Sequence, residues 1–180
     1  LVTTRILRAR RRRGARPCDL RAAALARARA RGGRDAPPPA SLADLVVPPE
    51  VGPALIKLKE LGFLLIVVTN QPDVGRGTQS IEVVNAIHDY LKSKLPLDAI
   101  YCCTDDKSSD YKPKPGMLEK AARDWNINLA VSFMIGDRWR DVEAGQNADC
   151  VSIFIDYDFA EKKPKPPFIS VESLSQAVEQ

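Results

Sequence analysis

The stretch that decides the fold is Val-Thr-Asn-Gln-Pro-Asp-Val-Gly-Arg-Gly, residues 68–77, together with the apolar run that precedes it. Residues 63–67, Phe-Leu-Leu-Ile-Val, are typical of a strand that is covered on both faces of a sheet. Thr69 and Asn70 follow where that strand should end. Because ligands bind at the carboxyl ends of strands in open α/β sheets, this stretch predicts a hydroxyl and an amide at a ligand crevice.

Helices and strands alternate from residue 37 to residue 180. Helices are expected over about 49–61, 79–95, 115–126 and 141–146 and from about 170, and strands over about 99–103, 131–135 and 150–155. Thr78 or Ser80 can cap the second helix, and Pro96 stops it. Strands joined by helical crossovers predict an α/β domain with a doubly wound parallel sheet. The short segments between them leave no room for a separate cap domain.

Two further segments place chemistry at the same edge of this sheet. Lys112-Pro-Lys-Pro-Gly-Met117 supplies an ammonium group, and Met134-Ile-Gly-Asp-Arg-Trp-Arg-Asp141 supplies two carboxylates. Asp137 lies just beyond the strand expected at 131–135. Asp141 follows one helical turn later, so its carboxylate faces the same way.

These groups match the needs of phosphate-ester hydrolysis, which requires donors for the phosphoryl oxygens, a cation and an in-line nucleophile. Thr69 and Asn70 can donate to the oxygens, and Lys112 can supply fixed positive charge. Asp137 is a hard oxygen ligand for Mg²⁺, and Asp141 could hold Lys112 or a metal-bound water. Taken singly, each residue has an ordinary alternative as a loop cap, a solvated lysine or a turn aspartate. Their order after three expected strands favours the functional interpretation.

The three segments resemble motifs II, III and IV of the haloacid dehalogenase superfamily of phosphohydrolases. The resemblance covers about residues 37–180 and is closest to the histidinol-phosphate and heptose-bisphosphate phosphatase branch. It implies that Thr69 is the motif II residue, Lys112 the motif III lysine, and Asp137 and Asp141 the motif IV carboxylates at the metal. It also implies a magnesium-dependent, capless, Rossmann-like phosphatase that acts on a small phosphorylated metabolite, namely a sugar phosphate such as a heptose bisphosphate.

The resemblance also suggests which residues contact substrate. Asn70, Gln71 and Lys114 lie within or beside the motifs, and we expect them to bind the substrate. Arg76 lies in a Gly-rich loop that closes over the substrate in the resembling phosphatases. It could contact a second phosphate, or it could be a solvated loop arginine.

The chain departs from that branch before Lys112. Many heptose-bisphosphate phosphatases carry a zinc-holding loop of Cys and His there, whereas this chain has only Cys102 and Cys103, which point to opposite faces of a strand. We therefore expect no zinc. Cys18 and Cys150 complete no metal spacing or disulfide framework, which is consistent with a reducing cytoplasm. Tyr111 stands where the branch often has a substrate-binding arginine.

Residues 1–36 are a different kind of chain. They hold twelve arginines against two aspartates, a net charge of +10, while residues 37–180 hold 15 basic and 21 acidic residues, a net charge of −6. We expect an irregular segment that adds nothing to the core. It could be an arm that binds nucleic acid, an organelle transit peptide, or non-native sequence produced by a reading-frame error in a GC-rich gene.

The nucleophile motif of the superfamily, a strand that ends in Asp-x-Asp, is not recognisable in this segment. Asp19 is the nearby carboxylate, and Arg21 occupies the position of the second aspartate, the general acid and base. Asp19 is therefore the candidate nucleophile, although no apolar strand precedes it.

Three functions remain open at this point. The first is a phosphatase, whose present copy is inactive if the nucleophile is missing. The second is a domain that binds a phosphorylated ligand without turnover, and the third is a polynucleotide 3′-phosphatase whose basic arm holds nucleic acid. We expect a monomer. No apolar run approaches the roughly 20 residues that a membrane-spanning helix needs.

Overall fold

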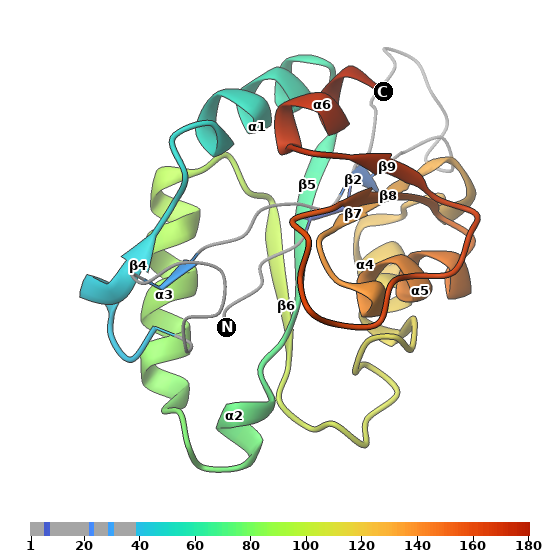
Figure 1. Cartoon of the computed structure of the whole chain (residues 1–180). Helices are drawn as coiled ribbons and strands as arrows, with labels where there is room; N and C mark the ends of the chain where they lie inside the picture. The colour runs from blue at the N-terminus through green and yellow to red at the C-terminus, as the bar shows by residue number, and fades with distance from the viewer. Residues whose placement is uncertain (1–5, 8–21, 24–28, 31–38) are drawn as a thin grey trace.

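The computed structural model of the chain describes residues 6–7, 22–23, 29–30 and 39–180. Its main body is a sheet with helices on both faces (Figure 1). No helix in the described part of the chain is long and apolar enough to cross a membrane.

The central sheet is formed mainly by five strands of residues 64–171. In space they run in the order β6, β5, β7, β8, β9, with short N-terminal strands between β5 and β7. The neighbours β5 and β6, β7 and β8, and β8 and β9 are all parallel, as expected for a doubly wound sheet. The strands are β5 (Leu64–Asn70), β6 (Ala99–Cys103), β7 (Phe133–Gly136), β8 (Val151–Ile155) and β9 (Ile169–Val171).

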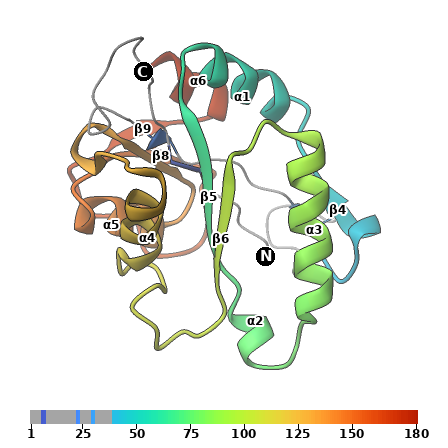
Figure 2. The same cartoon turned by 180° about the vertical axis from the view of Figure 1, so that it is seen from behind.

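The helices pack on this sheet in two groups. Helix α1 lies beside α6, and this pair contacts β5, β8 and β9 (Figures 1 and 2). Helix α4 contacts β5 and β6, and α5 contacts β7 and β8. The helices are α1 (Val51–Glu60), α2 (Pro72–Gly75), α3 (Ile81–Lys94), α4 (Gly116–Trp125), α5 (Trp139–Asn147) and α6 (Leu174–Glu179). A 3-10 turn, η2 (Leu42–Asp44), precedes β4, and another, η3 (Leu129–Val131), lies between α4 and β7.

Local sequence signals explain where the helices begin and end. The Ser80 hydroxyl accepts hydrogen bonds from the backbone N–H groups of Glu82 and Val83, so Ser80 rather than Thr78 caps α3. Helix α4 ends at Asn126, which adopts the left-handed conformation at a φ of 51°. The expected elements are therefore present, with boundaries within a few residues of those expected.

The N-terminal segment differs in part from the expectation of an irregular segment that adds nothing to the core, because three of its residue pairs form strands. Strand β1 (Ile6–Leu7) pairs antiparallel with β5 and β7, and β2 (Ala22–Ala23) pairs parallel with the same two strands. Strand β3 (Arg29–Ala30) pairs with β4 (Leu45–Val46) in a separate two-stranded sheet. The two-residue strands β1 and β2 therefore occupy part of the central position between β5 and β7, which a longer strand would fill completely. The composition of the segment did not predict this pairing. The remainder of residues 1–38 lies outside the described part of the chain.

Helix α3 buries one stripe that includes the only histidine of the chain. Val84, Ile87, His88 and Leu91 are buried, whereas Ile81, the first residue of the helix, is exposed. No hydrogen-bond partner for His88 Nε2 is found among the described residues. Burial lowers the pKa of His88 to about 4, and the opposing effects of the Asp89 and Lys92 charges are smaller.

We predict that His88 makes stability fall with pH below neutrality. The folded protein keeps His88 neutral, whereas the unfolded chain takes up a proton below a pKa of 6.5, so stability is lost as pH falls from 6.5 towards 4. Between pH 7 and pH 5 the free energy of unfolding should drop by about 1 to 2 kcal/mol more than in a His88→Gln variant. Urea unfolding at both pH values measures this difference. Equal losses in the two proteins would contradict the prediction.

Candidate active site

Strand β5 delivers the first polar group of the site. Thr69 is fully buried, and its hydroxyl accepts a hydrogen bond of 3.0 Å from the Gln71 side-chain amide. The Gln71 backbone N–H donates to the Cys103 carbonyl at 2.7 Å, which ties the end of β5 to the end of β6. Gln71, expected to contact substrate, thus orients the Thr69 hydroxyl.

Lys112 lies beside the same strand end, although it is 42 residues further along the chain. Its backbone N–H donates to the Asn70 side-chain oxygen at 3.1 Å, and the Asn70 amide donates to the Lys112 carbonyl at 3.0 Å. The Lys112 ammonium donates to the Val68 carbonyl at 2.6 Å. The side chain is only 1% exposed, which excludes the alternative of a solvated lysine.

Asp141 supplies the negative charge that accompanies Lys112 into the interior. Its Oδ1 lies 3.4 Å from the Lys112 ammonium, and its Oδ2 accepts a hydrogen bond of 2.9 Å from the backbone N–H of Arg138. Gly136 makes this approach possible, because a Cβ there would lie 2.3 Å from the Cβ of Asp141. Of the two uses expected for Asp141, the structure gives the contact with Lys112.

Asp137 occupies the turn between β7 and α5, immediately after Gly136, and is 4% exposed. It thus lies at the carboxyl end of β7, in the turn where Arg138 contacts Asp141. The residues predicted from three separate motifs therefore converge on the carboxyl edge of the sheet.

The fit of this edge to a magnesium ion rests on Asp137. Mg²⁺ takes one or two carboxylates and completes its shell with water and substrate phosphate. Asp137 can be one such ligand, whereas Asp141 is engaged with Lys112 and Arg138. No cluster of three His, Cys, Asp or Glu that could hold a metal is found among the described residues. Asp19 lies outside those residues.

Residues 159–162, which follow β8, contact the residues directly after Asp137. The Arg138 guanidinium stacks 3.8 Å from the Phe159 ring and pairs with Glu161 at 3.1 Å. Lys162 lies 3.8 Å from the Trp139 ring and pairs with Glu143 at 2.8 Å. These contacts hold the start of α5, and no pattern in the sequence indicated them.

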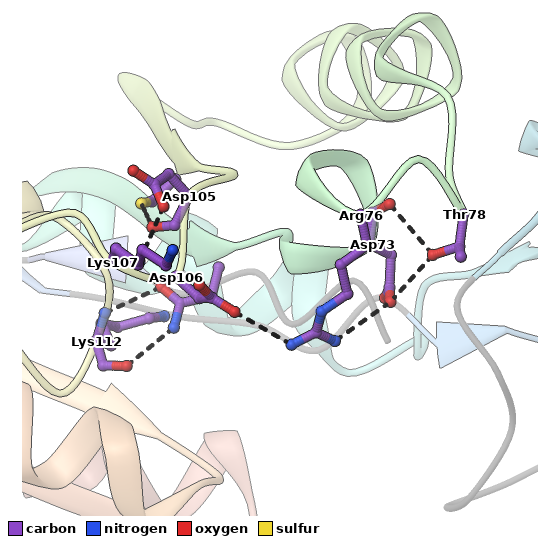
Figure 3. A network of polar contacts seen from close by, with 9 residues as sticks. Asp73, Arg76, Thr78, Asp105, Asp106, Lys107 and Lys112 are labelled. Carbon is purple, nitrogen blue, oxygen red and sulfur yellow. Dashed lines mark hydrogen bonds and ion pairs between the residues drawn. The ribbon is translucent and has the colours of Figure 1, made fainter.

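Arg76 and Lys114 are both engaged with protein groups. Arg76 pairs with Asp106 at 3.3 Å and lies 4.0 Å from Asp73. Figure 3 shows its guanidinium between these two carboxylates. The Lys114 ammonium donates to the carbonyls of Lys107 and Ser108, each at 2.9 Å, and so closes the loop after β6.

Two adjacent cysteines lie at the start of this loop. Cys102 is exposed and Cys103 is buried, in agreement with the strand alternation. Burial raises the pKa of the Cys103 thiol above its ordinary value, so this thiol stays protonated at neutral pH.

Comparison with known proteins agrees with this arrangement. A family model for haloacid dehalogenase-like hydrolases matches residues 39–149. This match covers more than half of the chain, and the chain belongs to that family.

Individual relatives extend the comparison. A D-glycero-D-manno-heptose-1,7-bisphosphate 7-phosphatase from Thermosynechococcus vestitus is 32% identical over 77% of this chain and 84% of its own length. A D-glycero-beta-D-manno-heptose-1,7-bisphosphate 7-phosphatase from Pasteurella multocida is 38% identical, but the match spans only 53% of this chain and 59% of that protein. Among solved structures, the D,D-heptose 1,7-bisphosphate phosphatase from B. bronchiseptica, complexed with magnesium and phosphate, aligns with a TM-score of 0.69 and 27% identity. That alignment covers 78% of this chain and 86% of the other.

We predict that Lys112 and Asp141 depend on each other for stability. Lys112→Met removes the cation beside a fully buried carboxylate and should lower the free energy of unfolding by about 3 to 5 kcal/mol. Lys112→Met with Asp141→Leu removes both charges and should recover a large part of that loss. Urea unfolding of the two single variants and the double variant measures the coupling. Additive effects of the two substitutions would contradict it.

Proposed function

We propose that this chain is a magnesium-dependent phosphatase domain that binds the phosphoryl group of a small phosphorylated sugar, such as a heptose bisphosphate. The observation that carries the proposal is the position of the Lys112 ammonium. It binds the carbonyl of Val68, the residue just before Thr69, and also lies against Asp141. A fixed cation thus lies at the strand end that carries the Thr69 hydroxyl and the Asn70 N–H, and phosphoryl oxygens bind to this combination of groups.

Each residue has a role in this proposal. The Thr69 hydroxyl and the Asn70 backbone donate to the phosphoryl oxygens, and Lys112 offsets their charge. Asp141 fixes Lys112, and Asp137 would hold Mg²⁺, which when bound offsets charge that develops on the phosphoryl group. Arg76 contacts a second phosphate or the body of the substrate, while Gln71 and Lys114 position Thr69 and the loop after β6.

The step that these residues cannot supply is the attack on phosphorus. That step needs a carboxylate at the end of the central strand and a second carboxylate that moves the proton. Asp19 is the candidate nucleophile, with Arg21 at the acid and base position. We therefore propose that the chain binds phosphate but turns over sugar phosphates negligibly, because residues that act as a unit fail together.

The names of the relatives support a sugar phosphate as the class of substrate. Tyr111, in place of an arginine, argues against assuming the heptose itself. We further propose that the domain acts as a monomer in the cytoplasm, where its free thiols would stay reduced.

We predict that the domain binds inorganic phosphate in a manner that depends on Mg²⁺ and Asp137. In calorimetric titrations, Mg²⁺ should tighten phosphate binding, and Asp137→Asn should abolish this gain because it removes the carboxylate that holds the ion. Asp89→Asn, on the exposed side of α3, is the matched control for the loss of one negative charge. Phosphate binding that is absent, or indifferent to Asp137, would overturn the proposed function.

We predict that replacing residues 1–36 with an apolar strand that ends in Asp-x-Asp-Gly creates Mg²⁺-dependent hydrolysis of sugar phosphates. The replacement supplies the attacking oxygen and the group that transfers the proton, while Thr69, Lys112 and Asp137 are already in place to stabilise charge. Phosphate release from a panel of sugar phosphates measures the gain over the unmodified chain. If the unmodified chain already hydrolyses substrate and Asp19→Asn abolishes this, then Asp19 is the nucleophile and the interpretation of the N-terminus is wrong.

A further inference from the structure

The Arg76 guanidinium joins two loops that follow neighbouring strands. Arg76 ends α2, directly after β5, and Asp106 lies in the loop after β6. Their side chains pair at 3.3 Å, while Asp73, from the start of α2, approaches the other terminal nitrogen at 4.0 Å (Figure 3). The only arginine of the β5 loop is thus flanked by two carboxylates of the same chain.

The backbone keeps these two loops together independently of that ion pair. Gly75 packs so closely on the loop after β6 that a Cβ there would lie 2.2 Å from the Thr104 carbonyl oxygen. The hydrogen bond between the Gln71 N–H and the Cys103 carbonyl ties the two strand ends. Within the loop after β6, the Lys114 ammonium donates hydrogen bonds to the carbonyls of Lys107 and Ser108. Asp106 is therefore held opposite Arg76 whether or not their charges attract.

The ion pair itself is weak and exchangeable. The Arg76 side chain is 59% exposed and that of Asp106 47% exposed, and one hydrogen bond of 3.3 Å joins them. Exposed pairs of this kind contribute little, because water screens them. A phosphate can accept two parallel N–H bonds from a guanidinium and binds it more strongly than a single long contact does.

We propose that Asp106 is a specificity-determining residue that competes with the second phosphate of a bisphosphorylated ligand for Arg76. Without such a ligand, Asp106 occupies the guanidinium. A ligand with one phosphoryl group at Thr69 and Lys112 leaves the pair intact, whereas a second phosphate must displace the carboxylate from the guanidinium. Asp106 therefore lowers affinity for bisphosphates and leaves affinity for monophosphates unchanged. This inference rests on the proposed function of the same site.

The test compares the wild-type chain, Asp106→Asn, Arg76→Gln and the double variant by calorimetry in Mg²⁺ buffer. The probes are inorganic phosphate and fructose 1,6-bisphosphate. Asp106→Asn should tighten binding of the bisphosphate about two- to fivefold, the range for an exposed ion pair, and leave inorganic phosphate unchanged. In the Arg76→Gln background the same substitution should have no effect, since the contested guanidinium is gone. Asp89→Asn controls for net charge and should change neither affinity.

The outcomes separate this inference from the proposed function. Failure of the wild-type chain to bind inorganic phosphate would overturn the proposed function and the inference with it. Normal phosphate binding with no gain for the bisphosphate in Asp106→Asn would overturn the inference alone. A gain shared equally by both probes, or one that persists with Arg76→Gln, would mean that Asp106 acts through the general potential of the crevice, and would also overturn it.

Discussion

The site depends on the buried ion pair between Lys112 and Asp141. Removing two charges from water is costly, and that cost is offset only when further hydrogen bonds complete both groups. Here the Lys112 ammonium also donates a hydrogen bond to the Val68 carbonyl, and the Asp141 carboxylate accepts one from the Arg138 N–H. Each partner therefore comes from a different element, and the pair forms only when β5, the loop before α4 and the start of α5 have all assembled. The charged groups of the site are therefore brought together by the same packing that assembles the carboxyl edge of the sheet.

The groups proposed to bind phosphate and the group that would attack it come from different parts of the chain. The groups that would hold a phosphoryl group come from residues 68–141, and residues 159–162 support the start of α5 from outside that range. The central position between β5 and β7 is met, in the described residues, by the two-residue strands β1 and β2. Pairing of the backbone can satisfy β5 and β7 without supplying a carboxylate at the strand end.

How much could be predicted from the sequence differs between local and long-range features. The apolar run before Thr69, the Ser80 cap and Asn126 at a helix end are local signals, and the structure has each of them. Strand β9 was not predicted, because three residues are too few to show a period. The contacts of Lys114 and Arg76 could not be predicted either, since they depend on how two loops meet. The family resemblance suggested ligand contacts for both residues, and the fold shows the protein groups with which they already pair.

The engaged state of those two cations bears on how the site recognises a ligand. A lysine that binds two backbone carbonyls shapes a loop and offers little attraction to an incoming anion. An arginine beside an exposed carboxylate remains available, but any anion must first displace that carboxylate. The buried cation Lys112 and the exposed cation Arg76 are therefore suited to different tasks. On the proposed function, the first would hold a phosphoryl group in a fixed geometry at low dielectric, and the second would discriminate among ligands by an exchange of partners in water.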